Sequence, residues 1–255
     1  MVPPQQKVRS LRQRDRWLEV EEQMDRPDAG EAATGGEMDR ALAELGFVHR
    51  WLGGARGTRR GLDDVRPGIE GEFTLLDVGC GGGDLASVIE DWSHKYHLTC
   101  RTILVDFNRS ACLHSSRRSS QETIVLQADA YSLPIRPRSV DIVHCGLFLH
   151  HFTTQRAACL LQRLLTIARL ALIVNDLHRH DVPYLVTRLG ARLLSRSEMV
   201  RHDAPVSVGR GFRRIDLENM AAAAGFRWTL LRRVWPYRWL AVKMIQPANE
   251  PRVAG

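Results

Sequence analysis

A glycine-rich turn after a short apolar run is the most chemically suggestive feature of the sequence. Gly79, Gly81 and Gly83 alternate with other residues, and Asp77 lies two residues before the first of them. Glycine lacks a Cβ, so the backbone can turn sharply and a ligand can approach the main chain closely. Asp84 stands where a dinucleotide-binding turn holds its third glycine, so the pattern is not G-x-G-x-x-G. The turn therefore differs from the dinucleotide-binding pattern at Asp84, and Asp77 adds a carboxylate just before it.

Two further acids follow apolar runs that read as strands. Asp106 comes directly after the run 102–105, and a carboxylate there can accept hydrogen bonds from both hydroxyls of a ribose. The alternative for Asp106 is an ordinary helix N-cap. Asp129 follows the run 124–126, where it could also be a simple turn residue.

Strand and helix patterns alternate from residue 73 onward. We expect strands over 73–78, 102–105, 124–126, 140–145 and 170–174, and helices over 83–92, 110–119, 155–167 and 215–224. Continuous apolar strands separated by helices predict a parallel sheet that is covered on both faces. The runs 228–234 and 239–245, joined around Pro236, can pair as an antiparallel hairpin. The expected fold is α/β, a Rossmann-like parallel sheet with a C-terminal antiparallel hairpin.

The rest of the chain divides around this domain. Residues 1–70 read as a helical N-terminal segment, with helices over 8–24 and 37–52, a linker over 27–36, and a stop at Gly53 and Gly54. Residues 176–211 are a long stretch with helical character near 184–194. We expect the domain to span 71–247 and residues 248–255 to be a disordered tail.

The combined motifs resemble those of class I methyltransferases that depend on S-adenosylmethionine (SAM). The segment 75–84 matches their D-x-G-x-G-x-G signature, and Asp106 and Asp129 follow in the family's order and spacing. The resemblance is close over about 73–175 and loose over 205–245. It implies SAM as the cofactor, with the parallel sheet and terminal hairpin of that family.

The resemblance also implies roles for individual residues. Asp106 would bind the ribose, Phe107 would pack beside the adenine, and Asp129 would meet the adenine amino group. The cofactor-binding residues expected on this basis are Asp77, Gly79, Gly81, Gly83, Asp106, Phe107, Asp129, Ala130 and Cys145.

The acceptor is suggested by the segments after the fourth and fifth strands. The Asn/Asp-Pro-Pro-Tyr/Phe motif of enzymes that methylate amines in nucleic acids is absent there. The pair His150–His151 instead resembles small-molecule methyltransferases related to quinone biosynthesis. The segments 174–180 and 201–212 are similar to bacterial methyltransferases of secondary metabolism, including those that act on polyketide-derived phenols.

Methyl transfer needs a nucleophile placed in line with the sulfonium and, for a hydroxyl, a group that removes its proton. An imidazole, with an ordinary pKa of about 6.5, suits that task. His151 is the first candidate and His178 the second, because each follows a strand end; either could instead be a packed or capping residue. We expect no metal, since Asp176 beside Asn175 reads as a structural strand end and His178 with His180 has no partner cluster.

We expect the substrate to lie above the carboxyl ends of the strands. The N-terminal helices and the stretch 176–211 would form the lid. Candidate wall residues, each of which could equally belong to the core, are Trp51, Phe148, Tyr184 and Phe212.

Composition limits the remaining choices. The 255 residues carry a net charge of +7, with many arginines between 186 and 214. Such a region could attract nucleic acid, an anionic small molecule or a membrane surface, or be a solvated face. Five widely spaced cysteines argue against disulfides and zinc. Without an apolar leader or a spanning run, a cytoplasmic location is expected.

The expected partner is a small-molecule substrate, with no nucleic acid, no membrane span and a possible homodimer. An RNA or protein methyltransferase remains the alternative, which the arginines favour. A second alternative is a non-catalytic protein that binds SAM in the same fold, against which the intact glycine turn and both acids argue.

Overall fold

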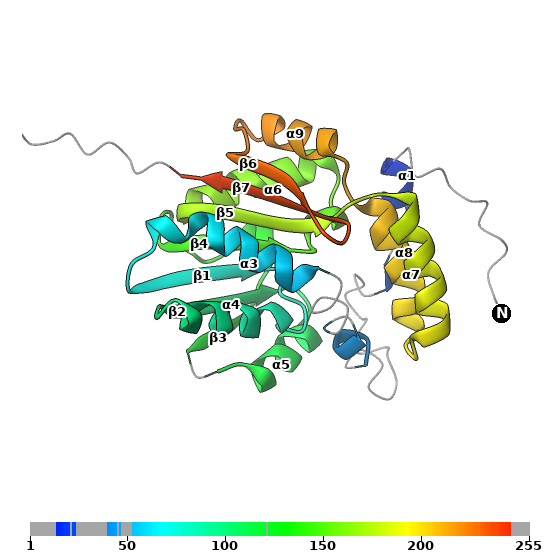
Figure 1. The fold of residues 1–255 in the computed structure, drawn as a ribbon, viewed down its shortest axis with the longest axis horizontal. Helices are drawn as coiled ribbons and strands as arrows, with labels where there is room; N and C mark the ends of the chain where they lie inside the picture. Colours follow the sequence, from blue (N-terminus) through cyan, green and yellow to red (C-terminus); the bar gives the residue numbers. More distant parts are fainter. Residues whose placement is uncertain are drawn as a thin grey trace, which may run out of the picture.

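The computed structural model describes residues 14–20, 22–23, 40–44, 46, 53–120 and 122–245. Figure 1 shows a central twisted sheet with helices on both faces and a helix pair, α7 and α8, at one end. The strands are β1 (Glu72–Val78), β2 (Thr99–Asp106), β3 (Thr123–Gln127), β4 (Val140–Gly146), β5 (Ala168–Leu177), β6 (Leu230–Val234) and β7 (Arg238–Met244).

The sheet has the order β3-β2-β1-β4-β5-β7-β6. The first five strands are parallel, and β7 pairs antiparallel with both β5 and β6. The register places Val78 beside Val105, and Asp106 beside Gln127, so the carboxyl ends of β1, β2 and β3 meet at one edge. The expected Rossmann-like parallel sheet with a C-terminal antiparallel hairpin is confirmed.

The helices separate into two layers and an end pair. They are α1 (Asp15–Leu18), α3 (Gly54–Val65), α4 (Asp84–Lys95), α5 (Arg109–Arg118), α6 (Thr154–Ile167), α7 (Asp181–Leu194), α8 (Glu198–Arg210) and α9 (Arg214–Ala223). Helices α3 and α4 cover one face of the sheet, whereas α6 and α9 cover the other (Figure 1). Helices α7 and α8 pack on each other beyond the carboxyl ends of the strands.

Two apolar cores hold the layers together. On one face Leu75 and Ile142 pack with Leu62 of α3 and Ile89 of α4. On the other, Leu76 and Val143 pack with residues of α6 and α9. Alternate residues of a strand point to opposite faces, and both faces of β1 and β4 are buried, so these strands read as continuous apolar runs.

The structure corrects the expected N-terminal and lid elements. Within the described residues the helix expected over 8–24 is only α1, and the chain turns at Glu19. Helix 37–52 is described only at 40–44 and 46, and the linker 27–36 and tail 248–255 lie outside the described residues. Gly53, which was expected to stop a helix, directly precedes one, since α3 begins at Gly54. The stretch 176–211 contains two helices, α7 and α8, where one was expected.

Candidate active site

A cavity of about 760 Å³ opens at the carboxyl edge of the sheet. Its floor comes from the segments that follow β1, β2, β3 and β4, and its other walls come from α7, α8 and the turn between β6 and β7. Glu22 and Leu42 of the N-terminal segment also line it. Ligands of open α/β sheets bind at this edge, and the volume is within the range of small-molecule pockets.

The glycine turn after β1 is hydrogen-bonded to the end of β2. The N–H groups of Gly79 and Cys80 donate to the carbonyl of Val105, at 2.8 and 3.0 Å. Gly79 has a φ of +73°, and a Cβ built there would lie 2.2 Å from the ring of Phe148. Glycine is therefore required at this position both for the turn and for the ring beside it.

The carboxylate of Asp106 joins the glycine turn to the β2 end. Its Oδ2 accepts from the N–H of Gly81 at 2.8 Å, and its Oδ1 accepts from the N–H of Asn108 at 2.8 Å. Burial raises the pKa of Asp106, and the two N–H groups oppose that rise. The N-cap of α5 is Asn108, so the alternative role for Asp106 as the cap is wrong. Phe107 lines the cavity and is 62% exposed, which leaves its ring available to a flat ligand.

The other predicted cofactor residues differ in what they contact. Asp129 and Ala130 line the cavity, and Asp129 caps a short 3₁₀ helix by accepting from the N–H of Tyr131 at 2.9 Å. Asp77 also lines it, but its carboxylate is almost fully buried and lies 2.7 Å from Nδ1 of His144. That contact fixes the orientation of the Asp77 carboxylate.

Two residues expected to touch the cofactor do not line the cavity. The side chain of Cys145 is fully buried in the core, because it points to the face covered by α6, and Gly146 lines the cavity in its place. Gly83 lies at the start of α4, behind Gly81 and Gly82, which do line it.

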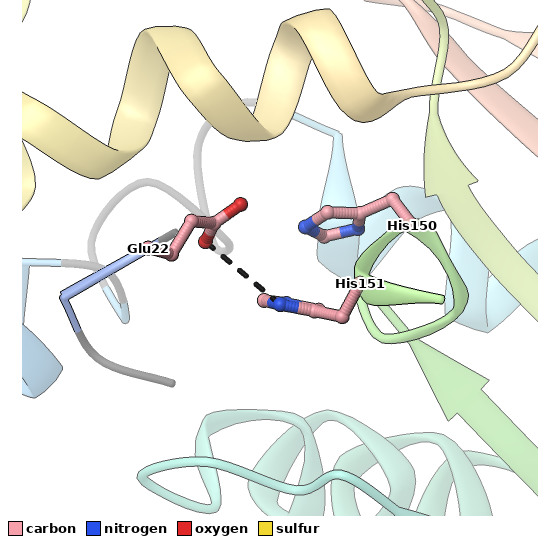
Figure 2. Close-up of side chains that lie close together, drawn as sticks. All are labelled: Glu22, His150 and His151. Atoms are coloured by element: carbon pink, nitrogen blue, oxygen red, sulfur yellow. Dashed lines mark ion pairs between the residues drawn. The ribbon is translucent and has the colours of Figure 1, made fainter. Parts of the chain in front are cut away.

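A cluster of Glu22, His150 and His151 lies at the β4 end of the cavity (Figure 2). Figure 2 shows both imidazoles turned toward the carboxylate of Glu22, which lies 3.9 Å from Nδ1 of His151. The sequence predicted His151 but neither of its neighbours. The doubled histidine was a signal for His150, whereas nothing in the sequence connects Glu22 with residues so far along the chain.

Buried charges hold this cluster in place. Asp176 at the end of β5 is fully buried, and its Oδ1 lies 2.8 Å from Nδ1 of His150. Burial acts to raise the pKa of Asp176, but His150 beside it lowers that pKa below its ordinary value. Arg210 of α8 donates to Glu22 at 3.0 Å and lies 3.4 Å from Nδ1 of His151. Asp176 is thus more than the structural strand end that the sequence suggested, since it orients a histidine of the cavity.

Glu22, His150 and His151 could each offer one ligand atom to a metal ion, and these atoms lie within 4.8 Å of one another. Asp176 would then support His150 as carboxylates support metal-binding histidines. Arg210 opposes this use, because its guanidinium lies beside Glu22 and would repel a cation there. A metal-independent reaction therefore stays a prediction.

Three residues expected at the acceptor end lie elsewhere. His178 does not line the cavity, because it turns toward Trp239 and Tyr237, with ring centroids at 5.3 and 6.1 Å. Burial, aided by nearby positive charges, lowers its pKa to about 4. Phe212 is fully buried in the core, and Tyr184 packs edge-on against Trp17 instead of facing the cavity. Phe148 does line the cavity, and Trp51 lies outside the described residues.

Comparison with known families gives a match for the central part of the chain. Residues 76–167 match the family described as "Methyltransferase domain", and this range includes the glycine turn, Asp106, Asp129 and the histidine pair. Over this range the chain is similar to methyltransferase domains. No curated protein matches the chain by sequence.

Solved structures agree in fold. A SAM-dependent methyltransferase from Aquifex aeolicus has a TM-score of 0.52 at 16% identity, over 73% of this chain and 89% of that one. Magnesium protoporphyrin IX methyltransferase from Synechocystis PCC 6803, solved with SAM bound, has a TM-score of 0.54 at 13% identity, over 89% and 98%. Human N-acetylserotonin methyltransferase has a TM-score of 0.61 at 15% identity, over 92% and 63%. These similarities establish the Rossmann-like methyltransferase fold.

Proposed function

We propose that this methyltransferase transfers a methyl group from SAM to a hydroxyl of a small-molecule acceptor, phenolic or quinone-like. One observation carries the proposal: a single cavity holds a glycine turn with Asp106 at one end and a histidine cluster at the other. Such a cavity can hold a cofactor and an acceptor side by side, with the reacting atoms between them.

The residues at the β1–β3 end fit SAM. Asp106 keeps unused lone pairs on both carboxylate oxygens, which can accept from the two ribose hydroxyls. Phe107 offers an exposed ring to the adenine, and Asp129 lies on the same rim. Gly79, Gly81 and Gly82 line the cavity without side chains of their own, so a ligand can approach the main chain of the turn closely. When bound, SAM would supply a methyl group that is carried on a positively charged sulfur, and this sulfur would be the leaving group.

The histidine end fits a hydroxyl acceptor. A phenol with a pKa of about 10 is mostly protonated at neutral pH, so removing its proton assists the reaction. We assign this role to His151, which lines the cavity and is 22% exposed at its side chain. With SAM bound, the acceptor oxygen would form a bond to the methyl carbon as the bond from that carbon to sulfur breaks, and the hydroxyl proton would pass to the imidazole of His151. His178 is not assigned a catalytic role, because it lies outside the cavity lining.

The experiment is a mass-shift screen of phenolic and quinol compounds with isotope-labelled SAM. His151→Ala should lower kcat by about 10²–10⁴-fold while leaving SAM affinity nearly unchanged. His178→Ala is the matched control, since it removes a histidine from the same sheet edge outside the cavity. Equal kcat in the wild type and His151→Ala would show that positioning alone carries the reaction.

An RNA or protein acceptor is the alternative, and it is favoured by the positive charge of the arginines in α7 and in the loop that follows it. Label incorporated into RNA or into a protein fraction, with none in any small molecule, would establish that alternative. An RNA affinity that falls steeply with salt would accompany it. Absence of turnover on every acceptor, with intact SAM binding, would favour the non-catalytic binding protein.

A further inference from the structure

Helix α7 exposes a continuous apolar stripe. Val182, Leu185, Val186, Leu189 and Leu193 recur at spacings of three and four residues, so they lie on one face of the helix. Leu189 is 59% exposed and Leu193 is 81% exposed, and none of the helix's 14 residues is buried. A packed surface helix normally turns such a stripe toward the core, whereas an exposed patch of this kind marks an interaction site.

The opposite face of α7 attaches it to the protein. Tyr184 and Thr187 are half-buried, and Tyr184 meets Trp17 with ring centroids 5.5 Å apart. The helix packs on α8 and lies at the outer end of the molecule (Figure 1). Packing on this opposite side therefore fixes the orientation of α7 and leaves the side chains of the apolar stripe largely exposed.

Basic residues flank this stripe. Arg188 and Arg192 are one helical turn apart along its side, and Arg196 follows the end of the helix. The one acid of α7 is Asp181, at the N-terminal end of the helix. Leucines on one face with arginines beside them form the pattern of helices that lie in the plane of a membrane surface, where the leucines enter the acyl region and the arginines meet anionic headgroups.

We propose that α7 docks this protein on an anionic lipid bilayer through Leu185, Leu189 and Leu193. Val186 belongs both to the apolar stripe and to the cavity lining. Pro183, on the same helix, also lines the cavity. Docking therefore places this wall of the cavity beside the lipid surface. The proposal does not depend on methyl transfer, since it concerns binding alone.

Charge favours the bilayer over a second copy of the chain. In a twofold pair, the same surface of each copy faces the other. Two copies of α7 packed through this stripe would bring the arginines of one copy near those of the other, and the stripe carries no acid to compensate. An anionic bilayer instead satisfies both the apolar stripe and the positive charge, which agrees with the net charge of +7.

The test measures partition of the full chain onto phosphatidylcholine vesicles with and without phosphatidylglycerol. Binding is expected to the anionic vesicles, with little to neutral ones. Leu189→Ser combined with Leu193→Ser should lower the partition coefficient at least about tenfold, because two large apolar side chains no longer enter the bilayer. Arg188→Gln and Arg192→Gln should each lower it roughly fivefold at low salt.

The matched control combines Leu113→Ser and Ile215→Ser. These side chains are also exposed, at 46% and 56%, but lie on α5 and α9. This control should bind vesicles as the wild type does. A separate variant, Leu189→Trp, should show blue-shifted fluorescence on anionic vesicles, which reports insertion even if the serine variants fold poorly.

Three results would overturn the proposal. The first is no binding of the wild type to anionic vesicles. The second is an equal loss of binding in the control pair. The third is a dimer in solution that the serine pair converts to monomer, because the stripe would then be covered by a second copy of the chain.

Discussion

Replacing Asp106 by alanine tests the cofactor end of the cavity most directly. The carboxylate accepts from the N–H groups of Gly81 and Asn108, each at 2.8 Å, and both contacts are charge-assisted. Its remaining lone pairs are those assigned to the ribose hydroxyls. Asp106→Ala therefore removes the ribose contacts and releases the glycine turn from the end of β2.

The expected loss follows from these contacts. A hydrogen bond to a charged group contributes about 1.5–3 kcal/mol, and each 1.4 kcal/mol corresponds to about a tenfold change in affinity. Loss of one such contact to SAM alone predicts an affinity about 10- to 150-fold lower. Asp106→Asn should also bind weakly, because its amide nitrogen cannot accept a hydrogen bond from either N–H group or from a ribose hydroxyl.

Isothermal titration calorimetry with SAM and with S-adenosylhomocysteine measures this loss. Both ligands contain the ribose, so both affinities should fall by the same factor. Asp64→Ala is a suitable control, because Asp64 pairs with Arg232 and lies outside the cavity lining. A folded Asp106→Ala protein that binds both ligands as tightly as the wild type would refute the assignment of Asp106 to the ribose.

Three further outcomes are expected. Methyl transfer should survive exhaustive chelation, and activity that EDTA abolishes and magnesium or zinc restores would place a metal at Glu22, His150 and His151. Gly79→Ala should lower the free energy of unfolding by at least about 1–2 kcal/mol and weaken SAM binding, because φ is +73° and the added Cβ meets Phe148; the melting temperature of this variant and calorimetry check both effects. His178 should make the protein less stable in acid. Its pKa falls from 6.5 to about 4 on folding, so its contribution is present above pH 6.5 and is lost as pH falls toward 4. His178→Asn should therefore show a smaller drop in melting temperature over that range than the wild type, and an equal drop would contradict the reasoning.

The strands and the glycine turn could be predicted because their signals are local. An apolar run buried on both faces is recognisable in a few residues, as at β1 and β4, and its C-terminal acid follows directly. The order of the three motifs then predicted which strand ends meet. The structure changed the bounds of these elements by a few residues at most.

Helices α3 and α8 escaped prediction because their sequences disfavour helices locally. Helix α3 contains Gly57 and Gly61, which lower helix propensity. A Cβ at Gly57 would lie 2.4 Å from the amide oxygen of Asn175, so glycine allows α3 to pack closely on β5. Helix α8 contains Pro205 and has no clear apolar periodicity, because it is packed on several sides, including by Trp17 against Gly209.

The sequence by itself determined the fold class, the glycine turn and the acid at the end of β2, since each depends on neighbouring residues and on the regular geometry of a parallel sheet. Tertiary structure alone decided which histidine faces the cavity. His151 and His178 both follow strand ends, but side-chain direction depends on packing with distant elements, so one lines the cavity while the other packs on Trp239. Glu22 reaches the same cavity from the N-terminal segment, where Arg210 holds its carboxylate. The periodicity and spacing of residues in the sequence do not predict the contact between Glu22 and Arg210, because it forms only when the chain folds.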